Sequence, residues 1–473
     1  MLMPGSAERQ RLLGVVSAQV DDFFEALDAL PVAPEVTASE IRGHLARYDF
    51  EMPLAADTAL ADALGMLTRW STHNAHPRYF GLFNPTPSFM GILADTLSAT
   101  VNSQLATWSA SPAGIEIERH LVRYVAGLAG LNVERCGGSF TTGGAEANQT
   151  AVLTALTRAF PEYGERGLRA LSGQPVFYAS AESHLAWLKI AHACGLGREA
   201  LRLVPVDGEL RLDVAALRAR IAADRAAGAL PFMVAATAGT TSAGVLDPLD
   251  DIAELCRNEK LHLHVDAAWA GVCLLSERLR PALAGIERAD SLTIDAHKWL
   301  SVPMGAGMFL CRENAWLSET FKVATAYMPP TPEGIADPYV HSIQWSRRLI
   351  GLKLFLTLAV AGRAGYAAAI EEQARQGDLL REKLVANGWE IVNATPLPVV
   401  CFRHLSLGND PAAYSALVAD VQRRGRVWIS ATRLRGQPAL RACITSYLTT
   451  EADLDILLDE LATASAELQT SRR

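Results

Sequence analysis

Apolar residues follow two different periods along this chain. In residues 7–30 and 56–70 they recur every three or four positions, which predicts two N-terminal helices. Between about residues 175 and 311, short apolar runs alternate with helical segments. The predicted strands are 175–179, 201–205, 231–236, 261–266, 291–295 and 306–311, and the predicted helices are 182–194, 213–227 and 249–258. Such alternation is typical of an α/β protein with a mainly parallel sheet.

The segments outside this alternation have other patterns. Residues 88–130 predict two helices around a turn, and residues 324–346 are a proline-bearing stretch expected of a functional loop. A helix at 347–385, apolar runs at 390–402 and 439–448, and a closing helix at 451–468 predict a small α+β domain. We therefore expect an N-terminal helical segment at 1–87, a large domain at 88–346 and a small C-terminal domain at 347–473.

Composition narrows the class of protein. The chain has 473 residues, of which 50% are hydrophobic, and a formal net charge of −8, which argues against a nucleic-acid-binding surface. Its seven cysteines include no C-x-x-C pair, so free thiols in a reducing cytoplasm are expected. The first 19 residues lack a long apolar core, and no long uncharged apolar stretch predicts a membrane span. We expect a cytoplasmic protein without a membrane or nucleic-acid partner.

The most informative position is Lys298. The predicted strand 291–295 ends in Asp295, and His297 and Lys298 follow it. A second apolar run follows at 305–310. A lysine between two buried strands is rare because a buried ammonium is costly. Lys298 is therefore a candidate Schiff-base nucleophile, although a lysine reaching out from a strand end is the plainer interpretation of this residue alone.

Two further stretches supply partners for such a lysine. Asp266 ends an apolar strand, where an acid points toward the site region of an α/β sheet. Pyridoxal phosphate needs a lysine for its aldehyde and an acid against its pyridine nitrogen. The glycine-rich segment 137–148 precedes a helical pattern, and glycines entering a helix leave backbone N–H groups free for a phosphate. The three elements together predict a pyridoxal 5'-phosphate site with no metal.

With these elements in view, the chain from about residue 70 to the C-terminus resembles the group II pyridoxal-phosphate-dependent amino-acid decarboxylases. That family includes the aromatic-L-amino-acid, histidine, glutamate and 2,4-diaminobutyrate decarboxylases. The matching motifs are HPRYF at 76–80, WSASP at 108–112, TGGAEA at 142–147, ESH at 182–184, HVDAAW at 264–269 and DAHKW at 295–299. They are specific for the family and much less specific for the substrate.

The resemblance implies the type I fold of pyridoxal-phosphate enzymes. Its large domain is a mostly parallel seven-stranded sheet that binds the cofactor, followed by a small α+β domain. It also implies a homodimer with the active site at the interface, the N-terminal helices forming an arm that packs on the second subunit.

The family match also implies roles for individual residues. Lys298 would join the cofactor and later carry a proton, and Asp266 would pair with the pyridine nitrogen. His184, just inside the predicted helix 182–194, would stack on one face of the ring, and Ala268 would lie against the other.

Phosphate contacts are expected from Gly144, Ala145 and His297. Many relatives have serine where Ala145 stands, so the hydroxyl contact would come from elsewhere. The candidates to replace it are Thr142, Thr240 and Thr241. The role of Asp295 stays open, since a strand-terminal cap is an equally good interpretation.

Substrate contacts are less specific. Arg441 either binds the substrate α-carboxylate or forms a structural ion pair. Tyr339, in the loop, is expected to protonate the substrate carbon after CO2 leaves, and its rivals for that role are His341 and Tyr327. The expected lining residues of the substrate pocket are Phe83, Gln104 and Trp108.

These residues predict decarboxylation of an L-amino acid to its amine, with an aromatic substrate favoured by family frequency. The more polar wall at Gln104 keeps an acidic or polar substrate open. An aldehyde synthase would use O2 at the same carbon, and Tyr339 speaks against it. An aminotransferase or carbon–carbon lyase is disfavoured by the HPR and WSASP motifs, and a non-catalytic cofactor-binding subunit by the intact Lys298, Asp266 and His184.

Overall fold

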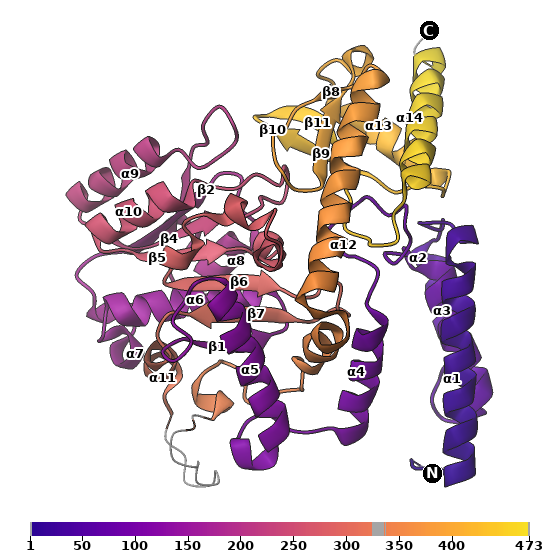
Figure 1. Cartoon of the computed structure of the whole chain (residues 1–473), viewed down its shortest axis with the longest axis horizontal. Coiled ribbons are helices and arrows are strands. Elements are labelled where there is room, and N and C mark those ends of the chain that lie inside the picture. The colour runs from indigo at the N-terminus through magenta and orange to yellow at the C-terminus, as the bar shows by residue number, and fades with distance from the viewer. Residues whose placement is uncertain (1, 324–334, 336, 472–473) are drawn as a thin grey trace.

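The large domain is built on one seven-stranded sheet (Figure 1). The structure is a computed structural model, and it describes residues 2–323, 335 and 337–471. The strands run in the order β1-β7-β6-β5-β4-β2-β3. Their bounds are β1 Gly137–Thr141, β2 Pro175–Ser180, β3 Leu201–Val204, β4 Leu230–Thr237, β5 His262–Asp266, β6 Ser291–Asp295 and β7 Gly307–Cys311. Strand β7 runs opposite to the other six strands of this sheet. The predicted mostly parallel seven-stranded sheet is therefore confirmed.

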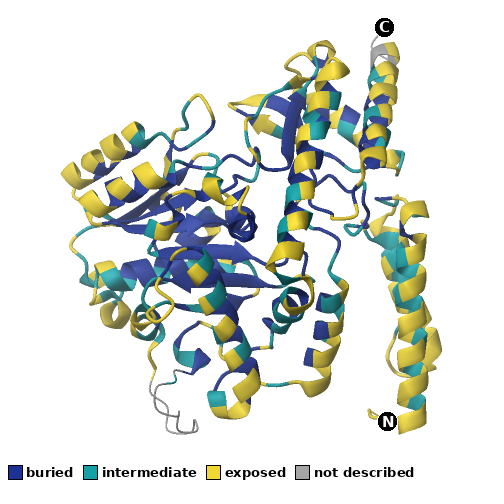
Figure 2. Cartoon of the chain, in the orientation of Figure 1, coloured by how far each residue is buried: buried dark blue, intermediate teal, exposed yellow. Residues whose placement is uncertain are grey.

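The central strands are buried on both faces, as expected of a parallel sheet covered by helices. Every residue of β5, β6 and β7 is buried. Figure 2 shows the sheet as the dark core of this domain, with exposed residues on the outer faces of the surrounding helices. The covering helices include α5 Pro112–Leu128, α6 Gly144–Ala159, α8 Ala186–Ala193, α9 Val214–Ala226 and α10 Leu249–Glu259.

Two boundaries near the glycine-rich segment differ from the prediction. Gly137–Thr141 forms strand β1, paired antiparallel with β7, where only a turn was expected. Helix α6 begins at Gly144, six residues before the predicted helical pattern at 150–160. The strand depends on its neighbour: a Cβ on Gly138 would lie 2.4 Å from the carbonyl oxygen of Phe309, so close tertiary pairing overrides the low strand propensity of glycine.

The small C-terminal α+β domain is confirmed. Its four-stranded antiparallel sheet has the order β10-β11-β9-β8. The strands are β8 Glu390–Ile391, β9 Val399–Arg403, β10 Ser430–Leu434 and β11 Gln437–Cys443, and the helices are α12 Leu352–Ala386, α13 Pro411–Arg423 and α14 Glu451–Ser471. A core of buried apolar side chains from α12, α13, α14 and the sheet holds it together.

Helix α12 joins the two domains (Figure 1). By length and composition alone it is the one helix, within the described part of the chain, that could cross a membrane. Gly362 breaks its helical geometry with φ 64°, and the helix packs against α4 Phe89–Val101 and α5. Its packing against α4 and α5 is that of a helix that connects two domains, and one such helix by length and composition is weak evidence for a membrane span.

The N-terminal helices form an arm that stands beside the body of the molecule (Figure 1). The arm consists of α1 Ser6–Ala26, α2 Ala38–Leu45 and α3 Ala56–Trp70, and none of the three helices contains a buried residue. The backbone after α1 is tied to the C-terminal domain by a hydrogen bond from Val32 N–H to the Gly425 carbonyl, 2.7 Å. The arm therefore presents most of its surface to solvent in the single chain, as Figure 2 shows.

Candidate active site

The predicted cofactor residues meet at one edge of the large sheet. Asp266 ends β5 and Asp295 ends β6, and parallel strands place their last residues at the same edge. Lys298 follows in the turn after β6, and its Nζ lies 3.0 Å from Oδ2 of Asp295. The Lys298 side chain is 24% exposed, whereas that of Asp295 is 2% exposed. The carboxylate thus holds a partly accessible amine at the end of the sheet, which answers the open question of what Asp295 does.

The start of helix α6 lies against the same carboxylate. A Cβ on Gly144 would be 2.8 Å from Oδ2 of Asp295, so only glycine allows this close approach. Gly144 and Ala145 form the first turn of α6, where backbone N–H groups have no partner inside the helix. This is the arrangement that binds phosphate groups at helix N-termini.

The threonines considered as phosphate ligands have other partners. The N–H and the hydroxyl of Thr142 both donate to the Glu146 carboxylate, at 2.8 Å each. The hydroxyl of Thr240 accepts a hydrogen bond from the Val245 N–H at 3.0 Å. Thr241 is half-buried in the same turn. Of the three predicted substitutes for the missing serine, Thr241 is therefore the one whose hydroxyl makes no hydrogen bond among the described residues.

His297 is buried between Lys298 and the next strand. Its Nδ1 accepts a hydrogen bond from the Ala306 N–H at 3.2 Å, and its Nε2 lies 3.9 Å from Oδ2 of Asp295. Burial lowers the pKa of His297 below its ordinary value. The ring is therefore neutral at pH 7, with Nδ1 as an acceptor and Nε2–H as a donor directed toward the Asp295 carboxylate and the helix start.

Asp266 is buried and already oriented by two donors. Asn148 Nδ2 donates to Oδ2 at 2.8 Å, and the Ala268 N–H donates to Oδ1 at 3.1 Å. Ala268 itself is buried. Hydrogen bonds to a carboxylate favour its charged form, which is the form that pairs with a protonated pyridine nitrogen. The contribution of Asn148 was not predicted from the sequence, although the residue lies inside the quoted glycine-rich segment.

His184 lies before a helix and not inside it, so the predicted helix start at 182 was wrong. Helix α8 begins at Ala186, and its N–H donates to Nδ1 of His184 at 3.1 Å. A side-chain acceptor just before a helix satisfies a free first-turn N–H, which explains the shift. His184 is exposed on its outer side, yet desolvation by surrounding atoms lowers its pKa, and the charges of Asp266 and Lys298 also act on that pKa. The three residues therefore share one neighbourhood.

This donor set fits pyridoxal phosphate. Lys298 supplies an amine, Asp266 a fixed carboxylate, and Gly144 and Ala145 a helix start with free N–H groups. Oδ1 of Asp295 is buried without a hydrogen-bond partner, which marks a polar space beside the amine. In the described part of the chain, no group of three or more His, Cys, Asp or Glu side chains is placed to hold a metal ion.

A stack of aromatic rings connects the site to the C-terminal domain. Trp299, next to Lys298, stacks on Trp269 with ring centroids 4.9 Å apart, and Trp269 stacks on Phe83 at 4.5 Å. The guanidinium of Arg441 lies over the other side of Phe83, 4.8 Å from the ring centroid. Phe83 and Arg441 are thus placed together by the fold. Both tryptophans end motifs given above, HVDAAW and DAHKW, but no role was predicted for either of them.

Gln104, Trp108 and Tyr339 form a separate cluster near the end of the loop. Gln104 is exposed, and its Oε1 accepts a hydrogen bond from the Arg347 N–H at 2.8 Å. The indole N–H of Trp108 donates to Glu116 at 3.0 Å. Tyr339 packs against Trp345 with ring centroids 5.1 Å apart. Within one chain none of these contacts reaches the Lys298 end of the sheet, so their substrate roles remain predictions.

His341 and Tyr327 are the two alternatives to Tyr339 as the proton donor. His341 is buried, and its Nε2 shares a hydrogen bond of 2.7 Å with the hydroxyl of Ser318. Burial lowers the pKa of His341 to about 4, so it carries no proton to give at neutral pH. Tyr327 lies outside the described residues.

Comparisons with known proteins agree with this site. The model of the pyridoxal-dependent decarboxylase conserved domain matches residues 45–405. An aromatic-L-amino-acid decarboxylase from Bacillus atrophaeus is 30% identical over 468 residues, covering 96% of this chain and 95% of that protein. Tryptophan decarboxylase 2 from Oryza sativa subsp. japonica is 27% identical over 470 residues, covering 96% and 94%. The crystal structure of mouse CSAD superposes with a TM-score of 0.90 at 26% identity, covering 98% of this chain and 99% of that chain. The chain belongs to the pyridoxal-dependent decarboxylase family and is a pyridoxal-phosphate-dependent amino-acid decarboxylase.

Proposed function

We propose that this enzyme decarboxylates an aromatic L-amino acid to the corresponding amine. The observation that carries the substrate class is its similarity, over 96% of the chain, to aromatic-L-amino-acid and tryptophan decarboxylases. The argument from the sequence for a polar substrate rested on the polarity of Gln104. Gln104 uses its side-chain oxygen to hold the Arg347 backbone, so its polarity has a structural explanation.

Each residue at the sheet edge has a separate role in the proposed reaction. Bound pyridoxal phosphate supplies the electron sink that the bond to the departing carboxylate needs. Lys298 offers the amine that holds the cofactor and then carries protons near the reacting carbon, while Asp295 keeps that amine in place. Asp266 holds the proton on the pyridine nitrogen by its negative charge. His184 shares this neighbourhood and is proposed to cover one face of the ring, opposite Ala268.

Arg441 is proposed to bind the substrate α-carboxylate. It is buried, and the structure gives its guanidinium only the Gly81 carbonyl at 2.7 Å and the Ser430 hydroxyl at 3.4 Å. Its Nε and Nη2 are buried and have no hydrogen-bond partner among the described residues. No ion pair joins Arg441 to an acid among the described residues, so the structural ion pair considered from the sequence does not form in the single chain. A buried unpaired cation is costly, and a substrate carboxylate would satisfy two of its N–H donors at once.

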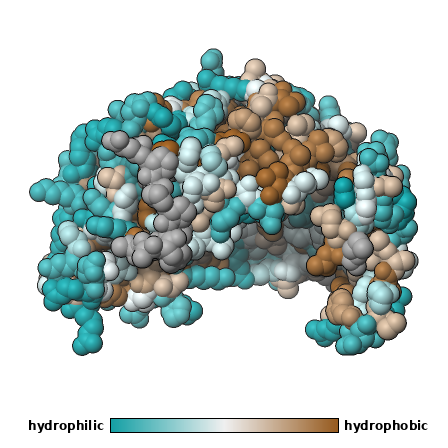
Figure 3. All heavy atoms as spheres, turned by 90° about the horizontal axis from the view of Figure 1, so that it is seen from below, coloured by the Kyte–Doolittle hydropathy of each residue, from teal (hydrophilic) through white to brown (hydrophobic). Residues whose placement is uncertain are grey.

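The surface supports a homodimer with an active site that two chains complete. Helix α4 exposes apolar side chains at every fourth position, namely Phe89, Leu93, Leu97 and Val101. Their exposed fractions are 52%, 39%, 51% and 72%, which gives one continuous apolar stripe. Figure 3 shows apolar side chains gathered on the lower face of the molecule, beside the hollow between the body and the arm. A second copy of the chain is the proposed partner for this face and for the arm.

The substrate class is tested by a panel of L-amino acids with the cofactor-loaded enzyme. We expect kcat/KM for tryptophan, tyrosine or phenylalanine to exceed that for glutamate and aspartate by at least about 100-fold, because an apolar pocket discriminates strongly against a charged side chain. A higher kcat/KM for an acidic substrate would overturn the aromatic assignment and leave the decarboxylase chemistry intact.

A further inference from the structure

A row of polar side chains runs along strand β5 of the large sheet, from the amino end of the strand to its carboxyl end. His262, His264 and Asp266 occupy alternate positions of β5, so they face the same side of the sheet. Ser291 on β6 is in register with His264 and faces the same side. All four residues are buried, and the neighbouring positions that face the other side of the sheet, Leu263, Val265 and Leu292, are apolar. Burying polar groups in this way is costly unless each is hydrogen-bonded, so their partners are informative.

The outer half of the row begins at Arg158, at the end of α6. Its Nη1 lies 2.6 Å from Nδ1 of His262, and Nε2 of His262 lies 2.7 Å from the hydroxyl of Ser291. Arg158 is itself held by Asp290 at 3.5 Å and by the ring of Trp316, 3.5 Å from its guanidinium carbon. The cation therefore has a fixed position from which to donate.

The inner half continues to the cofactor carboxylate. The Ser291 hydroxyl lies 2.8 Å from Nδ1 of His264, and Nε2 of His264 lies 3.0 Å from Oδ1 of Asn148. Asn148 Nδ2 then donates to Asp266 at 2.8 Å. Five hydrogen bonds thus join Arg158 to Asp266 without a gap.

The available donor and acceptor groups determine which atom donates in each hydrogen bond of this row. Arginine can only donate, so Nδ1 of His262 accepts and its Nε2 carries the proton given to Ser291. The Ser291 hydroxyl then donates to Nδ1 of His264, whose Nε2–H donates to Asn148. Burial lowers the pKa of His264 to about 3 and that of His262 well below its ordinary value, so both rings are neutral, as this direction requires.

Helix α6 supplies both ends of the row because its length matches that of β5. Asn148 and Arg158 are ten residues apart, about 15 Å along a helix. His262 and Asp266 are four residues apart, about 13 Å along a strand. The N-terminal turn of α6 lies at the candidate phosphate site and its last turn lies at the opposite edge of the sheet. One helix therefore positions the phosphate site, the Asn148 contact and the Arg158 cation together.

We propose that Arg158, His262, Ser291, His264 and Asn148 form a positioning relay that orients the Asp266 carboxylate for the pyridine nitrogen. The inference rests on the proposed function and deepens it. Each donor in the relay points toward Asp266, so the bond dipoles add and the guanidinium charge acts at the far end. Breaking the relay leaves Asn148, which donates to Asp266, less firmly oriented and weakens the hold of Asp266 on the cofactor.

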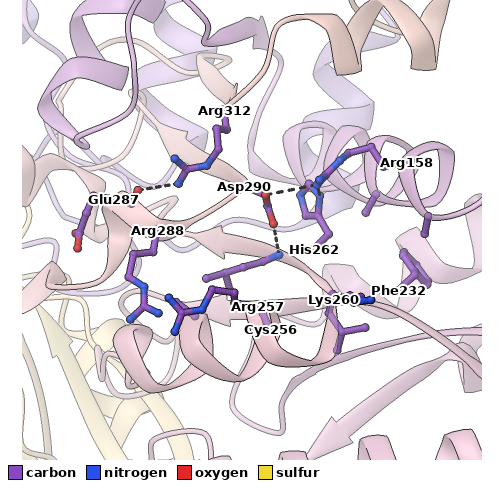
Figure 4. A pocket seen from close by; sticks show the side chains of 15 residues that line it. Arg158, Phe232, Cys256, Arg257, Lys260, His262, Glu287, Arg288, Asp290 and Arg312 are labelled. Carbon is purple, nitrogen blue, oxygen red and sulfur yellow. Dashed lines mark hydrogen bonds and ion pairs between the residues drawn. The ribbon is translucent and has the colours of Figure 1, made fainter.

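The outer end of the relay opens into a cavity of about 560 Å³. Figure 4 shows Arg158, His262 and Asp290 converging in this cavity, with Arg288 and Arg312 on its other side. Arg312 donates to the backbone carbonyls of Glu287 and Ala289, both at 2.7 Å, and has no bond to the relay. It is therefore a matched control for the loss of a half-buried guanidinium from the same cavity.

The relay is tested first by cofactor binding to apoprotein, measured from the absorbance of pyridoxal phosphate. We expect R158A and S291A to weaken binding by about tenfold, because each removes a link in the row of hydrogen bonds that ends at the Asp266 carboxylate, while R312A binds like the wild type. Guanidinium ion at tens of millimolar, entering the cavity, is expected to restore binding to R158A and to leave S291A unchanged. Wild-type affinity in both R158A and S291A, or weakening in R312A equal to that in R158A, would overturn the relay.

A second readout needs no cofactor. Histidine-selective 15N labelling should show His262 and His264 as neutral Nε2–H tautomers, and R158A should change the His262 pattern. An Nδ1–H tautomer at His264 would contradict the direction of the relay. A wild-type protein that binds no pyridoxal phosphate would refute the proposed function itself, whereas intact binding and decarboxylation in R158A and S291A would refute the relay alone.

Discussion

Nζ of Lys298 lies 3.0 Å from a buried oxygen of Asp295, and the same oxygen leaves no room for a side chain on Gly144. The amine, the carboxylate and the start of α6 are therefore fixed by one another. Strand β6 positions Lys298 and Asp295 at the sheet edge, and β1 leads into the start of α6. This mutual dependence leads directly to a prediction about Gly144.

Replacing Gly144 with alanine should disrupt the site with little effect elsewhere. The new Cβ would lie 2.8 Å from Oδ2 of Asp295, so the carboxylate must move away from Lys298. We expect pyridoxal phosphate affinity, measured by absorbance titration, to fall by at least about tenfold, as expected for lost positioning of a charged contact. The matched control is G164A, because a Cβ on Gly164 meets nothing within 4 Å. Equal affinities in G144A and G164A would show that the close approach has no role.

Replacing Arg441 with methionine should affect substrate binding more than folding. The guanidinium is buried with two unpaired donor nitrogens, so its removal relieves an uncompensated charge while the aliphatic stem is kept. We expect KM to rise about 10- to 100-fold, the value of charge-assisted hydrogen bonds to a carboxylate, with an unfolding midpoint no lower than that of the wild type. R433M, at an exposed position of the neighbouring strand β10, should leave KM unchanged. A normal KM in R441M would remove Arg441 from the substrate site.

The stability of the apoprotein should fall as the pH is lowered from about 6.5 to about 4, in part through His341. Burial lowers the pKa of this ring to about 4, from 6.5 in the unfolded chain. Between these values the unfolded state binds a proton that the folded state does not, so stability rises with pH by up to about 1.4 kcal/mol per pH unit. Urea unfolding at several pH values should show a shallower slope for H341N than for the wild type. H192N, at an exposed position, is the control, and identical slopes in wild type and H341N would contradict this account.

Replacing Tyr339 with phenylalanine tests the proton donor. The tyrosine lies at the end of the loop against Trp345, and His341 is held by Ser318, which leaves Tyr339 as the candidate acid among the described residues. We expect amine formation to fall by about 100-fold or more, the usual contribution of a general acid, and aldehyde to become the main product in air. Products are measured by mass spectrometry, with ammonia release as a second readout. Undiminished amine formation by Y339F would exclude the role.

The sequence was sufficient for the elements that carry strong local signals. Strands β5 and β6 are apolar runs that end in Asp266 and Asp295, and their prediction placed the cofactor residues correctly at a sheet edge. Strand β1 was missed because two glycines begin it, and only its pairing with β7 makes those glycines necessary. The short helix α2 was missed although Thr37 and Glu40 form a capping box, a signal that the sequence does contain.

The contacts between side chains of different elements in the site could not be predicted, because they depend on how the elements pack. Asn148 contacts Asp266 only because α6 packs across β5, and no local pattern encodes that packing. His262 and His264 alternate along a strand, which predicts a shared face but not the helix that covers it. Arg441 and Phe83 are far apart in the chain, yet the guanidinium lies directly over the Phe83 ring and donates to the nearby Gly81 carbonyl.

The most direct test of the account is product analysis by mass spectrometry after incubating the cofactor-loaded protein with a mixture of L-amino acids in air. We predict one product, the amine of an aromatic amino acid, lighter than its substrate by the mass of CO2. K298A should form none of it, whereas K322A, at an exposed lysine, should match the wild type. A keto acid or aldehyde as the main product, an amine from an acidic amino acid, or undiminished turnover by K298A would contradict the account.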